Sequence, residues 1–218
     1  MTRPSKKKIA QLAEQALCER YPEAQCALIY NEPYQLMIAG RLSAQCTDAR
    51  VNLVTPELFG KYPDLKSLAD ADIGDVENII RPCGLYHTKA ESIVNMCRIL
   101  YYELNGVIPD SIEKLIKLPG IGRKTANLIM GDIHKKPAVV CDTHCIRISN
   151  RLGLIATKDP TAAEKELRKL LPPEKSSDFC HRIVYFGREV CTARKPDCEH
   201  CIIREHLIRE FPQFICKV

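Results

Sequence analysis

The 218-residue chain contains no uncharged apolar run of the roughly 18–20 residues that a membrane-spanning helix needs. It also contains no low-complexity linker, no repeat of fixed period, and no convincing run of alternating apolar and polar residues closed by a hairpin turn. These absences argue against a membrane protein and against a β-sheet protein. The residues present, 45% hydrophobic and 27% charged, are typical of a soluble globular protein.

The N-terminal segment is not expected to be a secretion signal. Lys6, Lys7 and Lys8 make a basic start, but Glu14 and Glu19 lie where a signal peptide would be apolar. The apolar positions of this stretch fall on one helical face: Ile9, Leu12, Ala13 and Ala16. We therefore expect an amphipathic helix and a cytoplasmic protein.

Without a secretion signal, the twelve cysteines do not predict a disulfide framework. Most of them occur singly within apolar helical patterns, where small buried thiols are expected: Cys18, Cys46, Cys97, Cys145 and Cys180. The net charge of +5 permits a polyanionic partner without requiring one.

Helical periodicity runs through the rest of the chain and predicts an all-α protein of roughly ten helices. Two helix starts carry capping patterns. Asp110 precedes Glu113 by three residues, and Thr161–Glu164 forms a capping box. Lys135-Lys136-Pro137 is a plausible break between domains.

Leu118–Asn127 contains a turn suited to holding a phosphate. A helix over Asp110–Leu118 is expected to end before Pro119. Gly120 and Gly122 are expected to adopt torsions closed to other residues, with an apolar residue between them plugged into the core. A new helix then begins near Arg123 or Lys124, where unpaired N–H groups and the helix dipole favour an anion.

Lys124 has two interpretations at this helix start: it contacts a phosphate, or it attacks a sugar carbon with its neutral amine. The helix N-terminus and the adjacent Arg123 disfavour the ammonium form, which suits a nucleophile. Asp142 is suited to cap a helix over Thr143–Leu152 and to act as a general acid or base. His144 contacts phosphate or caps the same helix.

These residues belong to a set of segments that resembles the endonuclease III family of helix–hairpin–helix DNA glycosylases. The resemblance runs in order from about residue 34 to residue 203. It is carried by Leu42–Asp48, Gly84–Ala90, Leu118–Asn127, Val140–His144, Asn150–Gly153 and Cys191–Pro196.

The resemblance implies a two-lobed, all-α fold with the DNA cleft between the lobes. One lobe is an inserted helical domain, residues 27–135, and the other joins residues 1–26 to 136–218. The implied partner is double-stranded DNA with a damaged base or an abasic site, bound by a monomer in the cytoplasm, associated with the nucleoid.

The implied activity is that of a bifunctional DNA glycosylase/AP lyase for oxidised pyrimidines. Lys124 would attack the sugar C1′ and expel the base, and the resulting Schiff base would allow β-elimination, assisted by Asp142. The base must first leave the stack. By resemblance, Gln45 fills the gap and Leu85 wedges beside it. The implied DNA-binding residues are Gln45, Leu85, Gly120, Gly122, Arg123, His144, Arg194 and Lys195.

The family usually completes Cys-x6-Cys-x2-Cys-x5-Cys around a [4Fe-4S] cluster. Cys191, Cys198 and Cys201 fit this spacing, but Leu207 occupies the fourth position and cannot be a ligand. His206 or Cys216 would substitute, or a three-iron cluster would form, or the site would stay empty. Zinc held by the three cysteines with His200 or His206 is a further alternative.

Three rival functions remain at this level. A monofunctional glycosylase of the same superfamily lacks the lysine, so Lys124 argues against it. A non-catalytic helix–hairpin–helix module would bind DNA without nicking it, and it leaves the pairing of Lys124 with Asp142 unexplained. A metal or redox sensor would use only the cysteines.

Overall fold

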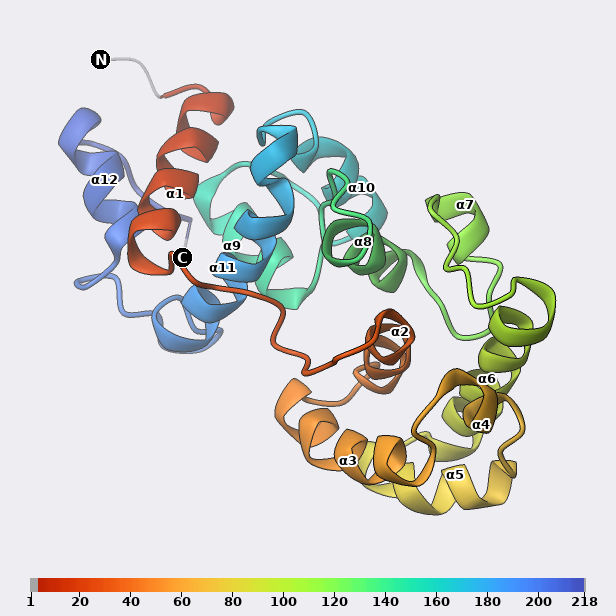
Figure 1. The fold of residues 1–218 in the computed structure, drawn as a ribbon. Helices are drawn as coiled ribbons and strands as arrows, with labels where there is room; N and C mark the ends of the chain where they lie inside the picture. Colours follow the sequence, from red (N-terminus) through yellow and green to blue (C-terminus); the bar gives the residue numbers. More distant parts are fainter. Residues whose placement is uncertain (1–3, 218) are drawn as a thin grey trace. The chain divides into compact units, whose positions relative to one another are not determined.

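A computed structural model describes residues 4–217, whose regular secondary structure is entirely helical, with no strand among them (Figure 1). The α-helices are α1 Lys6–Arg20, α2 Pro33–Leu42, α3 Asp48–Lys61, α4 Leu65–Ala69, α5 Ile73–Ile80, α6 Tyr86–Arg98, α7 Ile112–Leu115, α8 Arg123–Asp132, α9 Thr143–Leu152, α10 Pro160–Leu167, α11 Ser176–Glu189 and α12 Ile202–Glu210. Short 3₁₀ turns cover Arg81–Cys83 and Pro173–Lys175, and a π-helical segment, Ile99–Glu103, extends α6. The predicted all-α class is confirmed.

The chain folds into two compact units. One consists of Ala27–His134, and the other joins Met1–Cys26 to Lys135–Val218. The boundary proposed from the sequence lies one residue away from this division. No helix of residues 4–217 is both long enough and apolar enough to cross a membrane.

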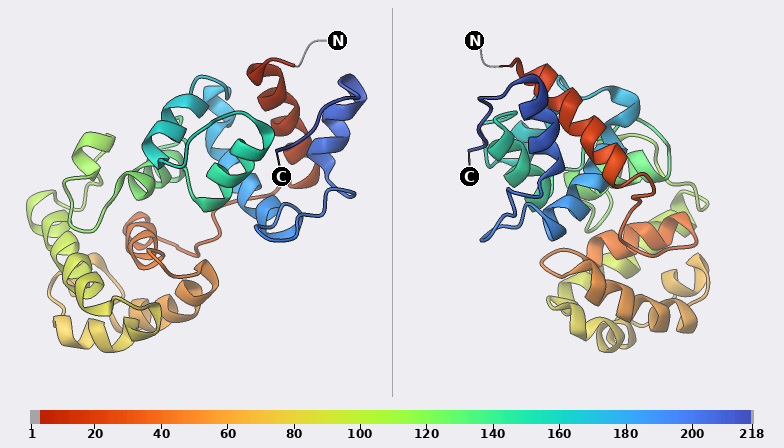
Figure 2. Two further views of the ribbon diagram at one scale, coloured as in Figure 1. Left: turned by 180° about the vertical axis from the view of Figure 1, so that it is seen from behind. Right: turned by 90° about the vertical axis from the view of Figure 1, so that its left-hand side faces the viewer.

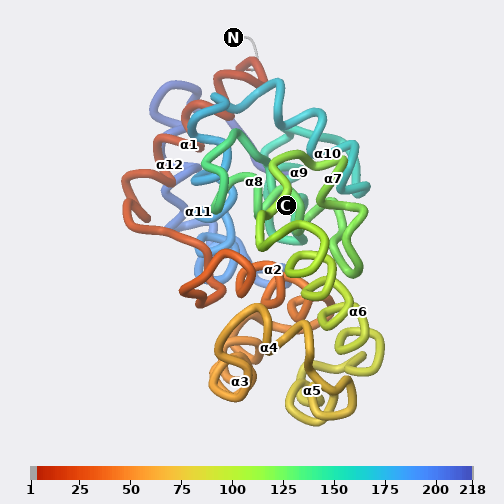
Figure 3. The backbone as a smooth tube through the Cα atoms, turned by 45° about the vertical axis from the view of Figure 1, so that its right-hand side comes forward, coloured from red at the N-terminus to blue at the C-terminus, as the bar shows by residue number. Residues whose placement is uncertain are grey.

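The unit Ala27–His134 is organised around α6, which packs against α4, α5 and α2 (Figure 3). The face of α6 that is buried in this core includes Ile93, Val94 and Cys97. Helix α2 also packs on α8, and the approach is close at Gly40. A Cβ atom there would lie 2.8 Å from Thr125 Cγ2. The glycine therefore sets the position of the helix that carries Lys124.

The other unit is built on α9 and α11, with α1 packed against both α11 and α12. Figures 1 and 2 show α1 and α12, from the two ends of the chain, side by side. The core face of α11 is buried and includes Phe179, Ile183 and Phe186. At Gly187 a Cβ atom would lie 2.5 Å from His144 Nδ1, so α9 and α11 approach closely beside that histidine.

The helix caps test the sequence predictions directly. Asp142 caps α9 as predicted, since its Oδ1 accepts a hydrogen bond from the Cys145 N–H at 2.7 Å. The other two predicted caps are wrong. Ser111, not Asp110, caps α7. Asp159 caps α10, because Pro160 occupies the first helical position and starts that helix before Thr161.

The helix predicted over Asp110–Leu118 is also too long, since α7 covers only Ile112–Leu115. The N–H groups of Lys117 and Leu118 bond to the carbonyls three residues earlier, at 3.2 and 3.0 Å. This tighter turn ends the α-helix before Pro119. Of the cysteines expected in the core, Cys97, Cys145 and Cys180 are buried, whereas Cys18 and Cys46 are only half-buried.

Candidate functional site

The turn between α7 and α8 depends on glycine at position 120. Gly120 has φ +78°, in the left-handed region, as predicted. A Cβ atom there would also lie 2.8 Å from both Cδ and Nε of Arg41. Arg41 is itself fixed, since its Nε donates to Ser92 Oγ at 2.8 Å. The turn is thus built against a side chain that links α2 to α6.

Gly122 does not fit the prediction made for it. Its torsions are φ −89° and ψ 173°, which any residue can adopt, because it is the N-cap of α8 and an N-cap is extended. A Cβ atom at Gly122 would meet no atom within 4 Å. Within the described residues, no side chain caps α8. Gly122 thus leaves room beside the start of α8.

Lys124 lies in the first turn of α8 and is exposed. The opposite face of the helix is buried, through Ala126, Leu128 and Ile129. Within its own unit, the Lys124 ammonium has no hydrogen-bond or ion-pair partner among the described residues. A helix packed on one face therefore presents an exposed amine at an N-terminus that Gly122 does not cap.

Gln45 and Leu85 lie in the same unit as Lys124, each in a loop before a helix. Both are exposed, and 55% of Leu85 is accessible to solvent. Both also adopt left-handed torsions, with φ 55° at Gln45 and φ 50° at Leu85. Such torsions are strained for residues with side chains and are found most often at functional sites. The two residues singled out from the sequence thus share an unusual backbone state.

Lys89 joins these two loops, and no sequence pattern predicted a role for it. Its side chain is fully buried. The ammonium donates to the Leu42 carbonyl at 2.8 Å and to the Cys83 carbonyl at 2.9 Å, just before the two loops begin. Burial lowers the pKa of Lys89. A lysine on an amphipathic helix is normally exposed, so periodicity alone gave no signal of this contact.

Asp142 and His144 lie in the other unit, at the start of α9. Asp142 is half-buried and acts as the cap. His144 does not cap the helix, because its Nδ1 lies 3.2 Å from Arg147 Nη2 and so accepts a hydrogen bond. Burial lowers the pKa of His144, and Arg147 and Arg188 add to this effect while Asp142 opposes it. Burial therefore favours the neutral form of the His144 imidazole.

Arg194 and Lys195 are exposed on a short loop after α11. Arg151 holds the loop, because its guanidinium donates to the carbonyls of Thr192 at 2.7 Å and Ala193 at 2.9 Å. Thr192 Oγ1 closes the turn by donating to the Lys195 carbonyl at 2.7 Å. Two cations thus project from a fixed backbone.

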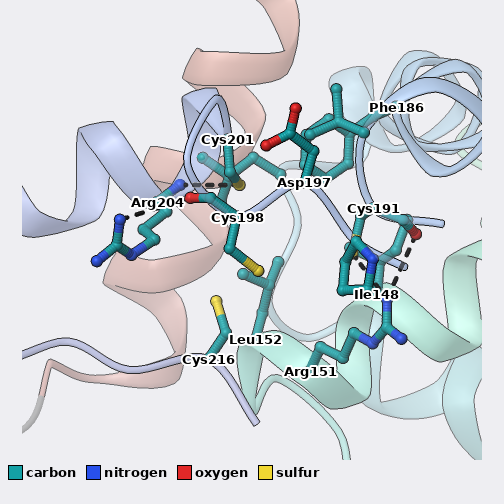
Figure 4. A pocket seen from close by; sticks show the side chains of 13 residues that line it. Ile148, Arg151, Leu152, Phe186, Cys191, Asp197, Cys198, Cys201, Arg204 and Cys216 are labelled. Carbon is teal, nitrogen blue, oxygen red and sulfur yellow. Dashed lines mark hydrogen bonds between the residues drawn. The ribbon is translucent and has the colours of Figure 1, made fainter. Parts of the chain in front are cut away.

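The cysteines near the C-terminus line one recess of about 380 Å³, including its mouth (Figure 4). We call it the cysteine recess. Cys191, Cys198, Cys201 and Cys216 all contribute to its wall. Arg151 Nη1 donates to Cys191 Sγ at 3.2 Å, and the Arg204 N–H donates to Cys201 Sγ at 3.4 Å.

The other ligands considered from the sequence lie elsewhere. His206 faces α1, with its Nε2 3.1 Å from Glu19 Oε2, and does not line the recess. Leu207 is fully buried and does not line it either. His200 Nδ1 is 2.8 Å from Asp197 Oδ2 on the surface. Among residues 4–217, no three His, Cys, Asp or Glu side chains converge as a single metal ion such as zinc requires.

Comparison with known proteins places this geometry in a family. Residues 38–173, more than half of the chain, match the model of the HhH-GPD superfamily of base excision DNA repair proteins. Residues 191–206 match the model of the iron-sulfur binding domain of endonuclease III, and this match ends one residue before Leu207.

Individual relatives agree over nearly the whole chain. Endonuclease III of Synechocystis sp. is 46% identical, covering 83% of each chain. Endonuclease III of Escherichia coli (strain K12) is 37% identical, covering 87% of this chain and 90% of the relative. A structure of a trapped covalent endonuclease III–DNA intermediate is 37% identical with a TM-score of 0.87, covering 99% of this chain and 97% of that one. A non-covalent endonuclease III–DNA complex is 38% identical with a TM-score of 0.86, covering 95% and 99%. The chain belongs to the endonuclease III family of the HhH-GPD superfamily of base excision DNA repair proteins.

Proposed function

We propose that the chain is a bifunctional DNA glycosylase and AP lyase that removes oxidised pyrimidines from duplex DNA and nicks the resulting abasic site. The observation that carries this proposal is the exposed amine of Lys124, held in the first turn of α8, to which the N-cap residue Gly122 provides no side-chain cap. The likeness to a covalently trapped endonuclease III–DNA intermediate supports it.

Lys124 is the nucleophile in this proposal. Its neutral amine attacks the sugar C1′ and displaces the damaged base, and the C1′–O4′ bond then breaks, with loss of a proton from Nζ and protonation of O4′, to give an open-chain Schiff base. On an abasic site the amine adds to the C1′ aldehyde, and water is lost instead. The Schiff base acidifies the neighbouring C2′ proton, so removal of that proton breaks the C3′–O bond and nicks the strand. Asp142 assists formation of the sugar cation and the proton transfers.

Phosphate binding follows from the backbone around Gly122. Gly122 provides no side-chain cap to the first N–H groups of α8, and a Cβ atom at Gly122 would meet no protein atom within 4 Å. A phosphate oxygen can therefore approach these donors, where the helix dipole favours its charge. Arg123, Arg194 and Lys195 add positive charge, and His144 adds a neutral donor. These contacts hold the backbone without reading the sequence of bases.

Base extrusion is assigned to Gln45 and Leu85. Both are exposed and held in strained torsions, so their side chains project from fixed loops. An apolar wedge and a hydrogen-bonding side chain are the two groups needed to separate a base step and to fill the gap. Lys89 fixes both loops through its two carbonyl contacts.

The cysteine recess holds an iron–sulfur cluster in this proposal. The residues present fit such a group, because thiols line one recess and two of the sulfur atoms already accept hydrogen bonds. When bound, the cluster would cross-link the loop that carries Arg194 and Lys195. Arg151 holds the same loop by its backbone carbonyls.

Borohydride trapping on DNA with an abasic site tests the assignment of Lys124. The full chain should give a covalent protein–DNA adduct, and Lys124→Ala should abolish it while DNA binding persists. Lys114→Ala is the matched control, since Lys114 is an exposed lysine of α7 with no assigned role.

The rival functions give different results in the same assay. A DNA-binding module binds without trapping or nicking, and a monofunctional glycosylase releases a base without trapping. Unchanged trapping by Lys124→Ala would show that another amine is the nucleophile. A cysteine-based sensor would show none of these activities.

A further inference from the structure

The fourth ligand position of the family is a leucine in this chain, yet the recess has a fourth cysteine. Cys216 comes from the segment after α12, and fourteen residues separate it from Cys201. It lines the same recess as Cys191, Cys198 and Cys201. Figure 4 shows the sulfur atoms of Cys198 and Cys216 pointing toward one another.

The segment that carries Cys216 is fixed on both sides of it. After α12 the chain turns back, with the Phe214 N–H bonded to the Phe211 carbonyl at 2.8 Å. Phe214 is buried and anchors the segment before Cys216. The Lys217 N–H donates to the Arg151 carbonyl at 2.7 Å and anchors it afterwards. Arg151 is also the residue whose guanidinium donates to Cys191 Sγ.

We infer that Cys216 replaces the missing fourth cysteine and that this chain binds its cluster through Cys-x6-Cys-x2-Cys-x14-Cys. The inference rests on the proposal that the recess holds an iron–sulfur cluster. In a four-iron cluster each thiolate binds a different iron, so the four sulfur atoms surround the cluster instead of converging on one point. Cysteines on the walls of one recess fit this requirement, and each loses its thiol proton on binding.

His206, the competing ligand, is excluded by its contacts with α1. His206 is turned toward Glu19 on α1, and Leu207 beside it is packed in the interior. Bringing the His206 imidazole to the recess would require rotation of α12, which would break the packing of α12 on α1. Cys216 needs no such movement, since it already lines the recess.

The test measures iron and sulfide in the full chain purified without oxygen. The wild type should hold about four irons and four sulfides per chain and absorb near ~400 nm. Cys216→Ala, which removes the ligand atom, should lose at least one iron per chain, either as a three-iron cluster visible by electron paramagnetic resonance or as complete loss. His206→Ala and Cys18→Ser, a cysteine of α1, should keep the wild-type iron content. A Cys216→Ala variant with the wild-type four-iron content, or a wild type without iron, overturns the inference.

A second measurement needs no variant to fold. Thiol alkylation mapped by mass spectrometry, before and after chelation of the iron, should show Cys216 protected in the loaded protein and released together with Cys191, Cys198 and Cys201. Equal labelling of Cys216 in both states overturns the inference. Neither readout involves DNA, so failure here is distinguishable from failure of the Lys124 assignment, which borohydride trapping reports.

Discussion

The two glycines of the hairpin are expected to respond oppositely to alanine. At Gly120, alanine must adopt φ +78°, which costs about 1–2 kcal/mol for a residue with a side chain. Its Cβ would also lie 2.8 Å from Arg41 Nε, so the guanidinium must move and its hydrogen bond to Ser92 is lost, at about 1 kcal/mol. Gly120→Ala should therefore destabilise the fold by about 2–3 kcal/mol. For a chain of this size that lowers Tm by about 4–12 °C.

Gly122→Ala should leave the fold within about 1 kcal/mol of the wild type, because the backbone is extended and the new Cβ meets no atom within 4 Å. The methyl group would instead occupy space that a phosphate needs in order to reach the α8 N–H groups. Loss of a hydrogen bond to a charged group costs about 1.5–3 kcal/mol, so affinity for abasic-site DNA should fall about 10–100-fold.

Thermal unfolding by circular dichroism and fluorescence anisotropy with a stable abasic-site analogue measure the two effects separately. Gly60→Ala is a suitable control, since a Cβ atom at Gly60 on α3 would also meet no atom within 4 Å. If Gly122→Ala binds DNA as tightly as Gly60→Ala does, the phosphate is held elsewhere. If Gly122→Ala unfolds more readily than Gly120→Ala, the assignment of the left-handed turn to Gly120 is wrong.

Three further outcomes are expected. Lys89→Met should destabilise the fold by about 2–4 kcal/mol, because two buried carbonyls lose their donor. Amide hydrogen exchange should then become faster in the loops of Gln45 and Leu85. Unchanged exchange there would contradict the role of Lys89 in positioning these loops. Asp142→Asn should keep the cap and nearly all the stability, whereas Asp142→Ala should destabilise the fold by about 1 kcal/mol. Both variants should nick abasic DNA more slowly than the wild type. Full activity of Asp142→Asn would show that the carboxylate takes no part in the reaction. The pKa of His144 is lower in the folded state, so this residue stabilises the fold fully above the ordinary histidine value near ~6.5, and its contribution is lost as pH falls through the lower folded value. His144→Gln should therefore flatten the dependence of the unfolding free energy on pH below ~6.5. An NMR titration should place the pKa of His144 below that of an exposed histidine.

The features predicted well from the sequence are those fixed by neighbours in the chain. The cap at Asp142 and the left-handed torsion at Gly120 both follow from a few residues on either side. Errors arose where two local signals competed. Asp110 and Ser111 can both cap a helix, and Ser111 does. Thr161 begins a capping box, but Pro160 is already the first residue of α10.

The features missed are set by contacts distant in sequence. Lys89 is 47 residues from Leu42, whose carbonyl it binds, and no periodic pattern marks such a contact. The choice between His206 and Cys216 depends on how the chain turns after α12 and on the hydrogen bond from Lys217 to Arg151. Spacing alone favoured neither, because a ligand one residue early and one nine residues late both depart from the family pattern.

The helices that carry the two proposed catalytic residues are alike in length but differ at their N-termini. Helix α9 begins with Asp142, whose Oδ1 binds the Cys145 N–H, so a carboxylate of the chain itself already meets the positive end of the helix. Helix α8 begins with Gly122, which has no side chain to do this. An external anion therefore meets no capping carboxylate at α8, in contrast to α9, and the N-terminus of α8 is where we propose that the phosphate binds beside Lys124. Capping also engages only one oxygen of Asp142, and the second remains for proton transfer. The capping and catalytic interpretations of this aspartate are thus compatible, and the cap is what holds the carboxylate in place.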